Sequence, residues 1–430
     1  EFVSSRHFPD EVQGDLLINN TIGFLGTKQH EMIDDGTGYQ SRHRQDLLTS
    51  TDGNFRPVDM EFAPDGSLYL VDWHNVLVGH MQHSARDPLR DHVHGRIYRI
   101  TYPSRPLVKP AKIAGASIEE LLENLKLPEY RTRYRTKREL RGRDAEDVLS
   151  SLNRWIAALD ASHPGHERFQ LEALWVSWGL NRIDVDLLRR LLIAKDHRVR
   201  SAAVHALRYN GHQIPDQDEL LRTAAQDDNG RVRLEAIAAT SWLPSDRGLP
   251  IIQLASKAPF DDWIKPVYET ARATLSGKSI QAEAESSPTT TLTGAARELL
   301  LKGAEVYRRE GHCITCHQED GNGLPAAQVP PISETRWANG DEELLIKLTL
   351  HGLLGPIDVK GTHYRGLVPM TAFKGLSDDE IAAVLTYVRN SFGNKASPVS
   401  PATVKRVREA TRERKGFYQP AELLEEHPLR

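Results

Sequence analysis

Cysteine is the residue that this 430-residue chain uses least, with two cysteines beside four methionines. Both lie in one short motif, as Cys313 and Cys316, so no other thiol could form a disulfide framework or a four-cysteine zinc site. A basic excess is also absent, because the formal net charge is −4. We therefore expect no general electrostatic attraction to nucleic acid or to an anionic membrane.

Long apolar runs and a leader peptide are missing as well. No apolar run approaches the ~20 residues that cross a bilayer, and the first residues, EFVSSRHF, lack the basic and apolar regions of a signal peptide. We expect no transmembrane segment. Because the chain begins without methionine, in what reads as the middle of a domain, we expect a fragment or a processed product, from which an upstream signal could have been lost. Its length predicts roughly two to four domains.

Residues 1–110 contain Asp-Gly turns at 35–36, 52–53 and 65–66, each beside residues typical of strands, and this pattern predicts hairpins. The clearest strand is LYLVDW at 68–73, where Leu68, Leu70 and Asp72 share one face. Further strands are predicted at 14–23 and 95–102. The spacing indicates about two four-stranded blades of a β-propeller, which needs roughly 4–8 blades. We expect upstream sequence or another chain to complete the ring.

From about residue 117 to 275 the pattern becomes helical and repeats. Aligning Arg168, Arg198 and Arg231 brings small and apolar residues into register. These are Phe169, Val199 and Val232, then Ala173, Ala203 and Ala236, then Leu174, Val204 and Ile237. Regular spacing with small residues at helix contacts predicts a HEAT-like α-solenoid, an all-α unit. Residues 276–294, rich in Ser and Thr, predict a linker.

A basic run at 131–143, RTRYRTKRELRGR, has two interpretations. It could form a nucleic-acid patch, or it could be a solvated helix face or a contact between domains. The acidic flanks and the absence of interleaved base-stacking aromatic residues favour the second interpretation, and we expect no nucleic-acid partner.

The two cysteines and the next residue, His317, form a C-x-x-C-H motif. In this motif two thiols bond the vinyl groups of a c-type heme and the adjacent histidine becomes an axial iron ligand. A zinc site would need further ligands from distant histidines. A thioredoxin-like dithiol would open a long helix, whereas the turn-forming QEDGNG follows Cys316. Heme attachment is therefore the favoured interpretation.

A bound heme iron needs a sixth ligand, which is usually methionine or histidine in electron-transfer cytochromes. Met370 is the one methionine after the motif, in a loop flanked by glycines and Pro369. Methionine is more often core filler, but a lone methionine on a loop of a small heme domain is a good ligand candidate. The histidine alternatives are His351 and His363, with His312 too close to the anchor to reach the opposite face easily.

Two helices are predicted around this site. Ser377 and Glu380 form a capping-box pattern before an amphipathic stretch that ends near Gly393. The stretch at 295–310 is also amphipathic, and its Gly303 would permit close approach of the later helix.

These motifs resemble class I cytochrome c domains appended to periplasmic dehydrogenases. The residues that carry the resemblance are GHCITCH, QVPPIS, WANGD at 337–341, LHGLLGPI at 350–357, VPM at 368–370 and the stretch at 376–394. The resemblance covers about 295–394, an all-α domain, and leaves 395–430 as a tail. It implies Cys313 and Cys316 as thioether anchors and His317 and Met370 as axial ligands. It also implies that the Pro331 loop supports His317 through a carbonyl and that Trp337 packs near the heme edge.

The stretch at 55–75, with its continuation to residue 100, is similar to later blades of glucose/sorbosone-dehydrogenase-type propellers, which are associated with pyrroloquinoline quinone and Ca²⁺. The best pocket candidates are Asp59, Asp72 and His74, because the ends of blade strands face the central channel. More histidines and aspartates lie close by, either as a metal or substrate pocket or as polar loop residues bonded to one another. They are His80, His83, Asp87, Asp91, His92 and His94.

The main functional hypothesis is electron transfer outside the cytoplasm, in the periplasm. A covalently bound heme would accept electrons from a quinone-dependent sugar or alcohol dehydrogenase-type propeller and pass them to a partner protein or a small acceptor. Two alternatives are an interaction scaffold built on the HEAT-like repeats and a peroxidase-like enzyme with an open sixth iron position.

Overall fold

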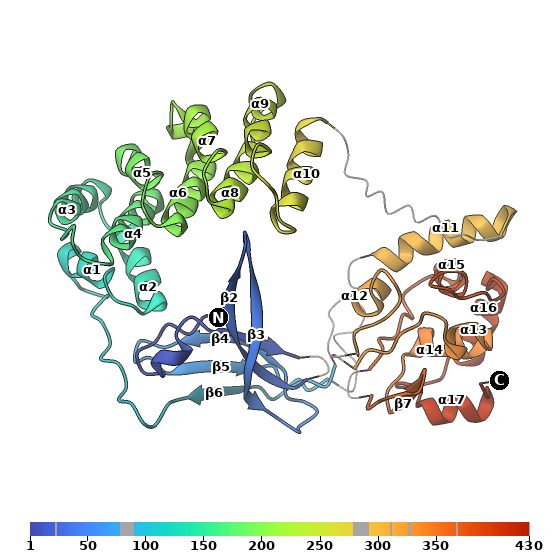
Figure 1. The fold of residues 1–430 in the computed structure, drawn as a ribbon. Coiled ribbons are helices and arrows are strands. Elements are labelled where there is room, and N and C mark those ends of the chain that lie inside the picture. Colours follow the sequence, from blue (N-terminus) through green and yellow to red (C-terminus); the bar gives the residue numbers. More distant parts are fainter. Residues whose placement is uncertain are drawn as a thin grey trace.

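The computed structural model describes residues 1–21, 24–77, 90–277, 292–309, 312–325, 328–366 and 369–429. Its elements fall into a strand-rich N-terminal part, a row of helices and a C-terminal unit of helices with one small hairpin (Figure 1). In the part of the chain that the structure describes, no helix is long and apolar enough to span a bilayer.

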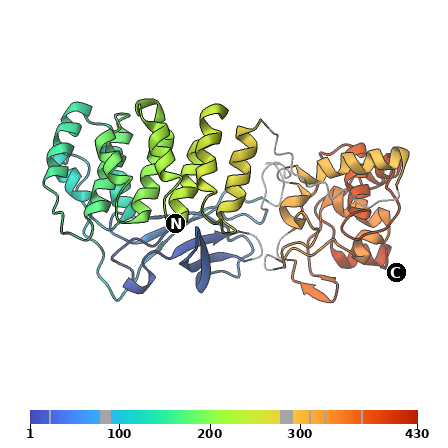
Figure 2. The ribbon, with the colours of Figure 1, turned by 45° about the horizontal axis from the view of Figure 1, so that its top comes forward.

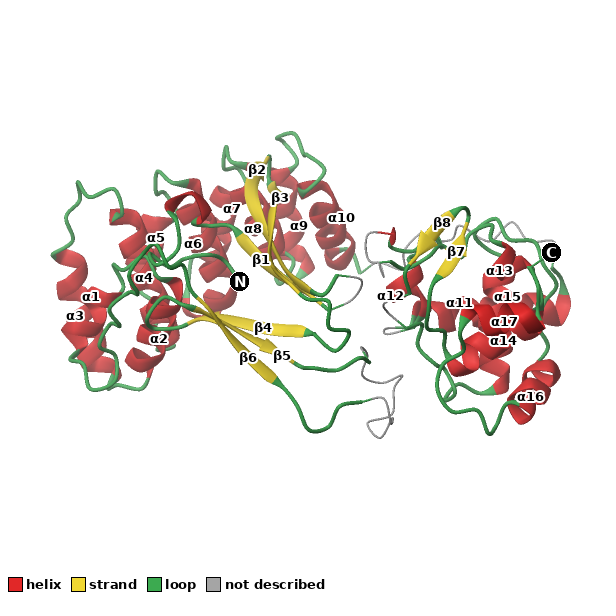
Figure 3. Ribbon diagram, turned by 90° about the horizontal axis from the view of Figure 1, so that it is seen from below, coloured by secondary structure: helices red, strands yellow, loops and turns green. Residues whose placement is uncertain are grey.

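The N-terminal part contains two three-stranded antiparallel sheets, with orders β1-β2-β3 and β4-β5-β6 (Figure 3). The strands are β1 (Leu16–Asn20), β2 (Gly26–Asp35), β3 (Gly38–Thr49), β4 (Pro57–Phe62), β5 (Leu68–Asp72) and β6 (Arg96–Ile100), after a short 3-10 helix at Asp10–Val12. Each sheet thus has three strands instead of the predicted four, and no closed propeller exists within the described residues. Membership of a propeller stays a prediction.

Two of the three predicted Asp-Gly hairpins are present. Gly36 joins β2 to β3 and Gly66 joins β4 to β5, each with a positive φ that glycine adopts without strain. The turn at Gly53 is different, because it carries the chain from one sheet to the next. The alternation predicted for β5 is confirmed: Leu68 and Leu70 are fully buried, whereas Tyr69 is 40% exposed.

Ten helices follow and stack side by side in chain order (Figure 2). They are α1 (Ile118–Asn124), α2 (Tyr130–Arg141), α3 (Ala145–Ala157), α4 (His166–Gly179), α5 (Val185–Leu191), α6 (His197–Asn210), α7 (Gln217–Ala224), α8 (Gly230–Thr240), α9 (Ser245–Ala255) and α10 (Ile264–Leu275). The aligned alanines Ala173, Ala203 and Ala236, on α4, α6 and α8, have no exposed surface. The HEAT-like assignment itself stays a prediction.

The strands and the helix row are joined by polar contacts. At the tip of the β2–β3 hairpin, the Thr37 backbone N–H donates to Asp261 at 2.6 Å, and the Arg231 guanidinium lies 3.9 Å from the centre of the Tyr39 ring. In the basic run on α2, Arg135 donates to the Phe62 carbonyl at 2.7 Å. This run therefore contributes to a contact between two parts of the chain, the interpretation that its composition favoured.

The C-terminal unit packs around its own apolar core. Its elements are α11 (Gly294–Arg308), α12 (Cys313–His317), α13 (Arg336–Asn339), α14 (Glu342–His351), β7 (Ile357–Val359), β8 (Thr362–Tyr364), α15 (Asp378–Arg389), α16 (Pro401–Ala410) and α17 (Pro420–Glu426). The capping box of Ser377 and Glu380 at the start of α15 is formed. Residues 395–429 are more than a tail, because Val404 and Leu423, on α16 and α17, are fully buried in this core.

Candidate heme site

The C-x-x-C-H motif forms the short helix α12. One helical turn separates Cys313 from Cys316, and both are free, half-buried thiols. Burial raises the pKa of Cys313 to about 12 and also raises that of Cys316. The helix stops at Gln318, whose φ of 62° leaves the helical region, so the predicted turn after the motif is present.

His317 is oriented by a backbone carbonyl. Its Nδ1 lies 3.2 Å from the Pro330 oxygen, and a proton on Nδ1 would donate to this oxygen and leave Nε2 free as a ligand. Burial lowers the pKa of His317 to about 4, so the ring is neutral near pH 7. The predicted supporting loop is therefore present, but the carbonyl belongs to Pro330, while the neighbouring Pro331 lines the adjacent cavity.

An apolar cavity with an empty volume of about 760 Å³, counting its open mouth, lies beside α12. Cys313, His317 and Met370 line the same cavity. Its wall includes apolar side chains from α13, α14 and α15, among them Trp337, Leu345, Leu348, Val384, Leu385 and Val388. The cavity thus brings the motif and the downstream methionine together.

The histidine alternatives to Met370 do not line this cavity. His351 is 5% exposed and its Nε2 lies 2.7 Å from the Thr411 hydroxyl. His363 is exposed and pairs with Asp358 at 2.8 Å. His312 precedes α12, with its Nδ1 3.3 Å from the Val306 oxygen. Of the four residues weighed as a sixth ligand, Met370 is the one at the cavity wall.

The loop of Met370 is fixed by backbone hydrogen bonds. Met370 and Leu353 exchange a pair of bonds, 2.8 Å from the Met370 N–H and 3.1 Å from the Leu353 N–H. Beyond Met370, the Phe373 N–H donates to the Thr349 carbonyl at 2.8 Å. Leu353 therefore holds the backbone at the methionine, and Thr349 of α14 holds the chain three residues beyond it, a pairing that no sequence motif predicts.

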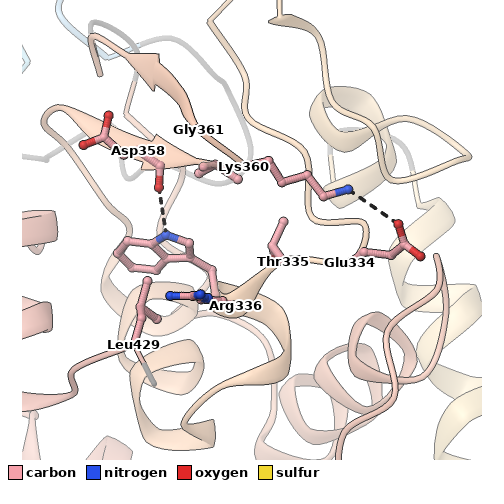
Figure 4. Close-up of a pocket in the computed structure, with 9 residues that line it drawn as sticks. Glu334, Thr335, Arg336, Asp358, Lys360, Gly361 and Leu429 are labelled. Carbon is pink, nitrogen blue, oxygen red and sulfur yellow. Dashed lines mark hydrogen bonds and ion pairs between the residues drawn. The ribbon is translucent and has the colours of Figure 1, made fainter.

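Trp337 lines this apolar cavity and also a second, more polar pocket, which Figure 4 shows. Its indole N–H points to the Asp358 carbonyl at 3.4 Å, and across the same pocket Lys360 faces Glu334 at 3.8 Å. The tryptophan is 8% exposed. Its position on the cavity wall agrees with the prediction that it packs near a bound cofactor.

The donor set and the cavity fit a heme. Two unpaired thiols one helical turn apart, a neutral imidazole and a thioether are the protein groups that hold c-type heme. The wall is apolar, as the porphyrin ring is.

Comparison with known proteins agrees with this geometry. The cytochrome c family model matches residues 300–392. Cytochrome c-552 of Thermus thermophilus is 38% identical over 112 residues, which are 25% of this chain and 81% of that protein. The chain belongs to the cytochrome c family. Its cofactor is therefore covalently bound heme c, and heme electron transfer is the function that these relatives support.

Two further relatives of this cytochrome c are parts of dehydrogenases. The fructose dehydrogenase cytochrome subunit of Gluconobacter japonicus is 32% identical over 107 residues, 25% of this chain and 22% of that protein. The cytochrome c subunit of the quinone alcohol dehydrogenase of Gluconacetobacter polyoxogenes is 29% identical over 124 residues, 28% of this chain and 25% of that protein. The chain thus spans about a quarter of each subunit.

The N-terminal part of the cytochrome matches a domain of unknown function (DUF7133) over residues 1–104.

Two of the three pocket candidates in this part, Asp72 and His74, lie together. The buried Asp72 carboxylate accepts hydrogen bonds from the backbone N–H groups of Arg56 and His74, at 2.7 and 2.8 Å. Asp59 is not part of this group: it is exposed and pairs across the sheet with Val71. An irregularity in β4 between Pro57 and Asp59 shifts its register, and this displaces the carboxylate.

His74, Asp91 and His94 also lie together, with one ligand atom of each within 4.8 Å of the others. Asp91 accepts bonds from two backbone N–H groups and from the His94 ring, and these lower its pKa. The Arg96 guanidinium lies 3.5 Å from His74 Nε2 and places a positive charge beside the group. The arrangement is thus a hydrogen-bonded network. His92 is exposed, and His80, His83 and Asp87 lie outside the described residues.

Proposed function

We propose that this cytochrome c is an electron carrier in which Cys313 and Cys316 hold the heme and His317 and Met370 are the axial iron ligands. One observation carries the proposal. Met370 is distant in sequence from Cys313 and His317, yet all three residues line one apolar cavity. When bound, the heme supplies one-electron chemistry through a change of iron valence.

The chain's own residues set the conditions of that chemistry. The Pro330 carbonyl holds the His317 ring in one orientation and one tautomer. The thioether of Met370 is a soft ligand that favours the ferrous state, so it raises the reduction potential. The apolar walls exclude water. A peroxidase needs an open sixth position, and the presence of Met370 at the wall gives that alternative no support.

Spectroscopy of the oxidised full chain tests the ligand assignment. A methionine-ligated ferric heme has a weak near-infrared band, and we expect Met370→Ala to abolish it. His363→Ala is the matched control, because His363 is exposed and outside the cavity, and it should retain the band. A band that survives in Met370→Ala contradicts the assignment.

We further infer that the electrons come from a dehydrogenase, in the periplasm or another extracytoplasmic space. Two relatives are named as dehydrogenase cytochrome subunits, and heme c is attached outside the cytoplasm. The N-terminal part would belong to a sugar or alcohol dehydrogenase-type propeller, completed by upstream sequence or another chain and using pyrroloquinoline quinone with Ca²⁺. A redox protein or a small acceptor would take the electrons.

Heme reduction in a full-length preparation tests the source of electrons. The protein would be loaded with pyrroloquinoline quinone and Ca²⁺, mixed with candidate sugars and alcohols, and followed at the visible bands of ferrous heme. Reduction by at least one substrate, absent without the quinone, is the expected result. If dithionite reduces the heme and no substrate does, the dehydrogenase link is wrong.

A further inference from the structure

The segment after the cytochrome c match, which ends at residue 392, packs against the loop that carries Met370. It runs from residue 395 through α16 and α17 to the end of the described chain. Through the Tyr418 backbone it contacts residues 352–354, which pair with Met370, and through the Arg408 side chain it contacts the segment just after Met370. We call residues 395–429 the C-terminal strap.

At Tyr418, three chain segments form a small backbone ladder. Leu353 is the middle rung and pairs in antiparallel fashion with Met370 and in parallel fashion with Tyr418. The Tyr418 N–H donates to the Gly352 carbonyl at 3.1 Å, and the Leu354 N–H donates to the Tyr418 carbonyl at 2.9 Å. The strap therefore fixes the segment that itself holds the backbone of Met370.

The packing at this ladder leaves no room for a side chain on Gly352. A Cβ there would lie 2.4 Å from the Met370 carbonyl oxygen and 2.6 Å from the Phe417 ring, and the φ of 76° is one that glycine adopts without strain. Gly352 thus lets the strap and the Met370 loop approach α14 from both sides at once.

Arg408 of α16 holds the segment just after Met370. Its guanidinium donates to the Lys374 carbonyl at 2.8 Å, to the Leu376 carbonyl at 2.7 Å and to the Asp378 carboxylate at 2.7 Å. Arginine suits this role, because its planar fork presents several donors in fixed directions. One side chain of the strap therefore bonds three acceptors, from Lys374 after the methionine to Asp378 at the start of α15.

Arg414 holds Tyr418 in place within the strap. It donates to both carboxylate oxygens of Glu422, at 2.6 and 2.7 Å, and to the Phe417 carbonyl at 2.8 Å. Its guanidinium also lies 3.4 Å from the centre of the Tyr418 ring. The Tyr418 side of the ladder is thus fixed by contacts internal to the strap, and it does not depend on Arg408.

We propose that the C-terminal strap keeps the Met370 loop closed and so keeps the methionine on the iron against competing ligands, with Arg408 and Tyr418 as positioning residues. The proposal rests on the role of Met370 proposed above. A competing ligand binds only when the loop is open, so its apparent affinity is the intrinsic affinity multiplied by the open fraction. Weakening the strap raises that fraction and tightens the binding of an added ligand.

Imidazole binding to the ferric heme of the full chain measures the open fraction. Arg408→Ala removes three charge-assisted hydrogen bonds, and we expect imidazole to bind about tenfold tighter or more. Arg406→Ala is the matched control on the same helix, because Arg406 is exposed and donates to Glu343 on α14. It should bind imidazole as the unmodified protein does. Arg408→Lys keeps the charge without the fork and should give an intermediate affinity.

Two further measurements distinguish a wrong assignment of Met370 from a wrong strap proposal. Met370→Ala sets the limit of a fully open site and should bind imidazole tightest. If it binds no tighter than the unmodified protein, the assignment of Met370 is wrong and the strap proposal fails with it. If it binds tightly while Arg408→Ala matches Arg406→Ala, the strap proposal alone is wrong. Heme content and far-ultraviolet circular dichroism confirm that Arg408→Ala is folded, and a folded variant with a weakened near-infrared band supports the proposal.

Discussion

Replacing Gly303 with alanine tests the crossing of α11 and α15 in the C-terminal unit, where α15 also lines the cavity. A Cβ on Gly303 would lie 2.0 Å from the Ala383 carbonyl oxygen and 2.8 Å from the Tyr387 Cβ. The first of these atoms belongs to the backbone of the opposing helix and cannot rotate away. To restore an ordinary contact, α11 would have to retreat from α15 by more than an ångström.

The expected change in the free energy of unfolding follows from two opposing effects. Overpacking of a close helix contact destabilises a fold by about 1–3 kcal/mol, and here the clash with backbone places the value at the upper end. Alanine gains about 1 kcal/mol over glycine in helix propensity. We therefore expect a net loss of about 1–2 kcal/mol, which lowers the melting temperature of a unit of this size by roughly 5 °C.

Thermal unfolding followed by heme absorbance measures this loss. The matched control is Gly375→Ala in the same unit, where a Cβ would meet no atom within 4 Å. Its melting temperature should stay within about 2 °C of the unmodified protein. If Gly303→Ala melts at the same temperature as this control or higher, the close crossing of α11 and α15 is wrong.

Three further predictions follow. Ser377→Ala removes the side-chain half of the α15 capping box, and chemical unfolding should show a loss of about 1 kcal/mol; an unchanged midpoint contradicts the cap. Hydrogen bonds from Arg309 and from the Ser377 backbone lower the pKa of Glu380 to about 2, below its ordinary value of 4.5. The contribution of Glu380 to stability is therefore present above pH 4.5 and lost as the pH falls toward 2. Glu380→Gln should flatten the acid unfolding curve in that window, and parallel curves would refute this. Asp261→Ala removes the acceptor of the Thr37 N–H, so limited proteolysis should cut the β2–β3 tip faster, while equal rates would show that the tip is held by other contacts.

The sequence predicts well where chemistry or local pattern is decisive. The spacing of Cys313, Cys316 and His317 predicts a heme motif, and Met370, as the lone downstream methionine, is predicted as the sixth ligand. The alternation of β5, the close approach at Gly303 and the capping box of α15 are local patterns too, and the structure contains all three.

What could not be predicted depends on contacts between distant segments. The irregularity in β4 that turns Asp59 away has no residue marker such as a glycine at the shift. The pairing of Leu353 with both Met370 and Tyr418 uses backbone groups, which every sequence offers alike. The strap at 395–429 has alternating charges that are typical of a solvated tail. The linear pattern reveals neither its few buried residues, such as Val404 and Leu423, nor the partners of Arg408 and Arg414.

We propose that this cytochrome c carries its heme on Cys313 and Cys316. The most direct test is the intact mass of the full chain, produced in cells that mature c-type cytochromes, followed by mapping of the peptide that contains both cysteines. We expect the mass of the polypeptide plus one heme, with the added mass on that peptide and neither thiol open to alkylation. A chain at its unmodified mass with two alkylated thiols would contradict it.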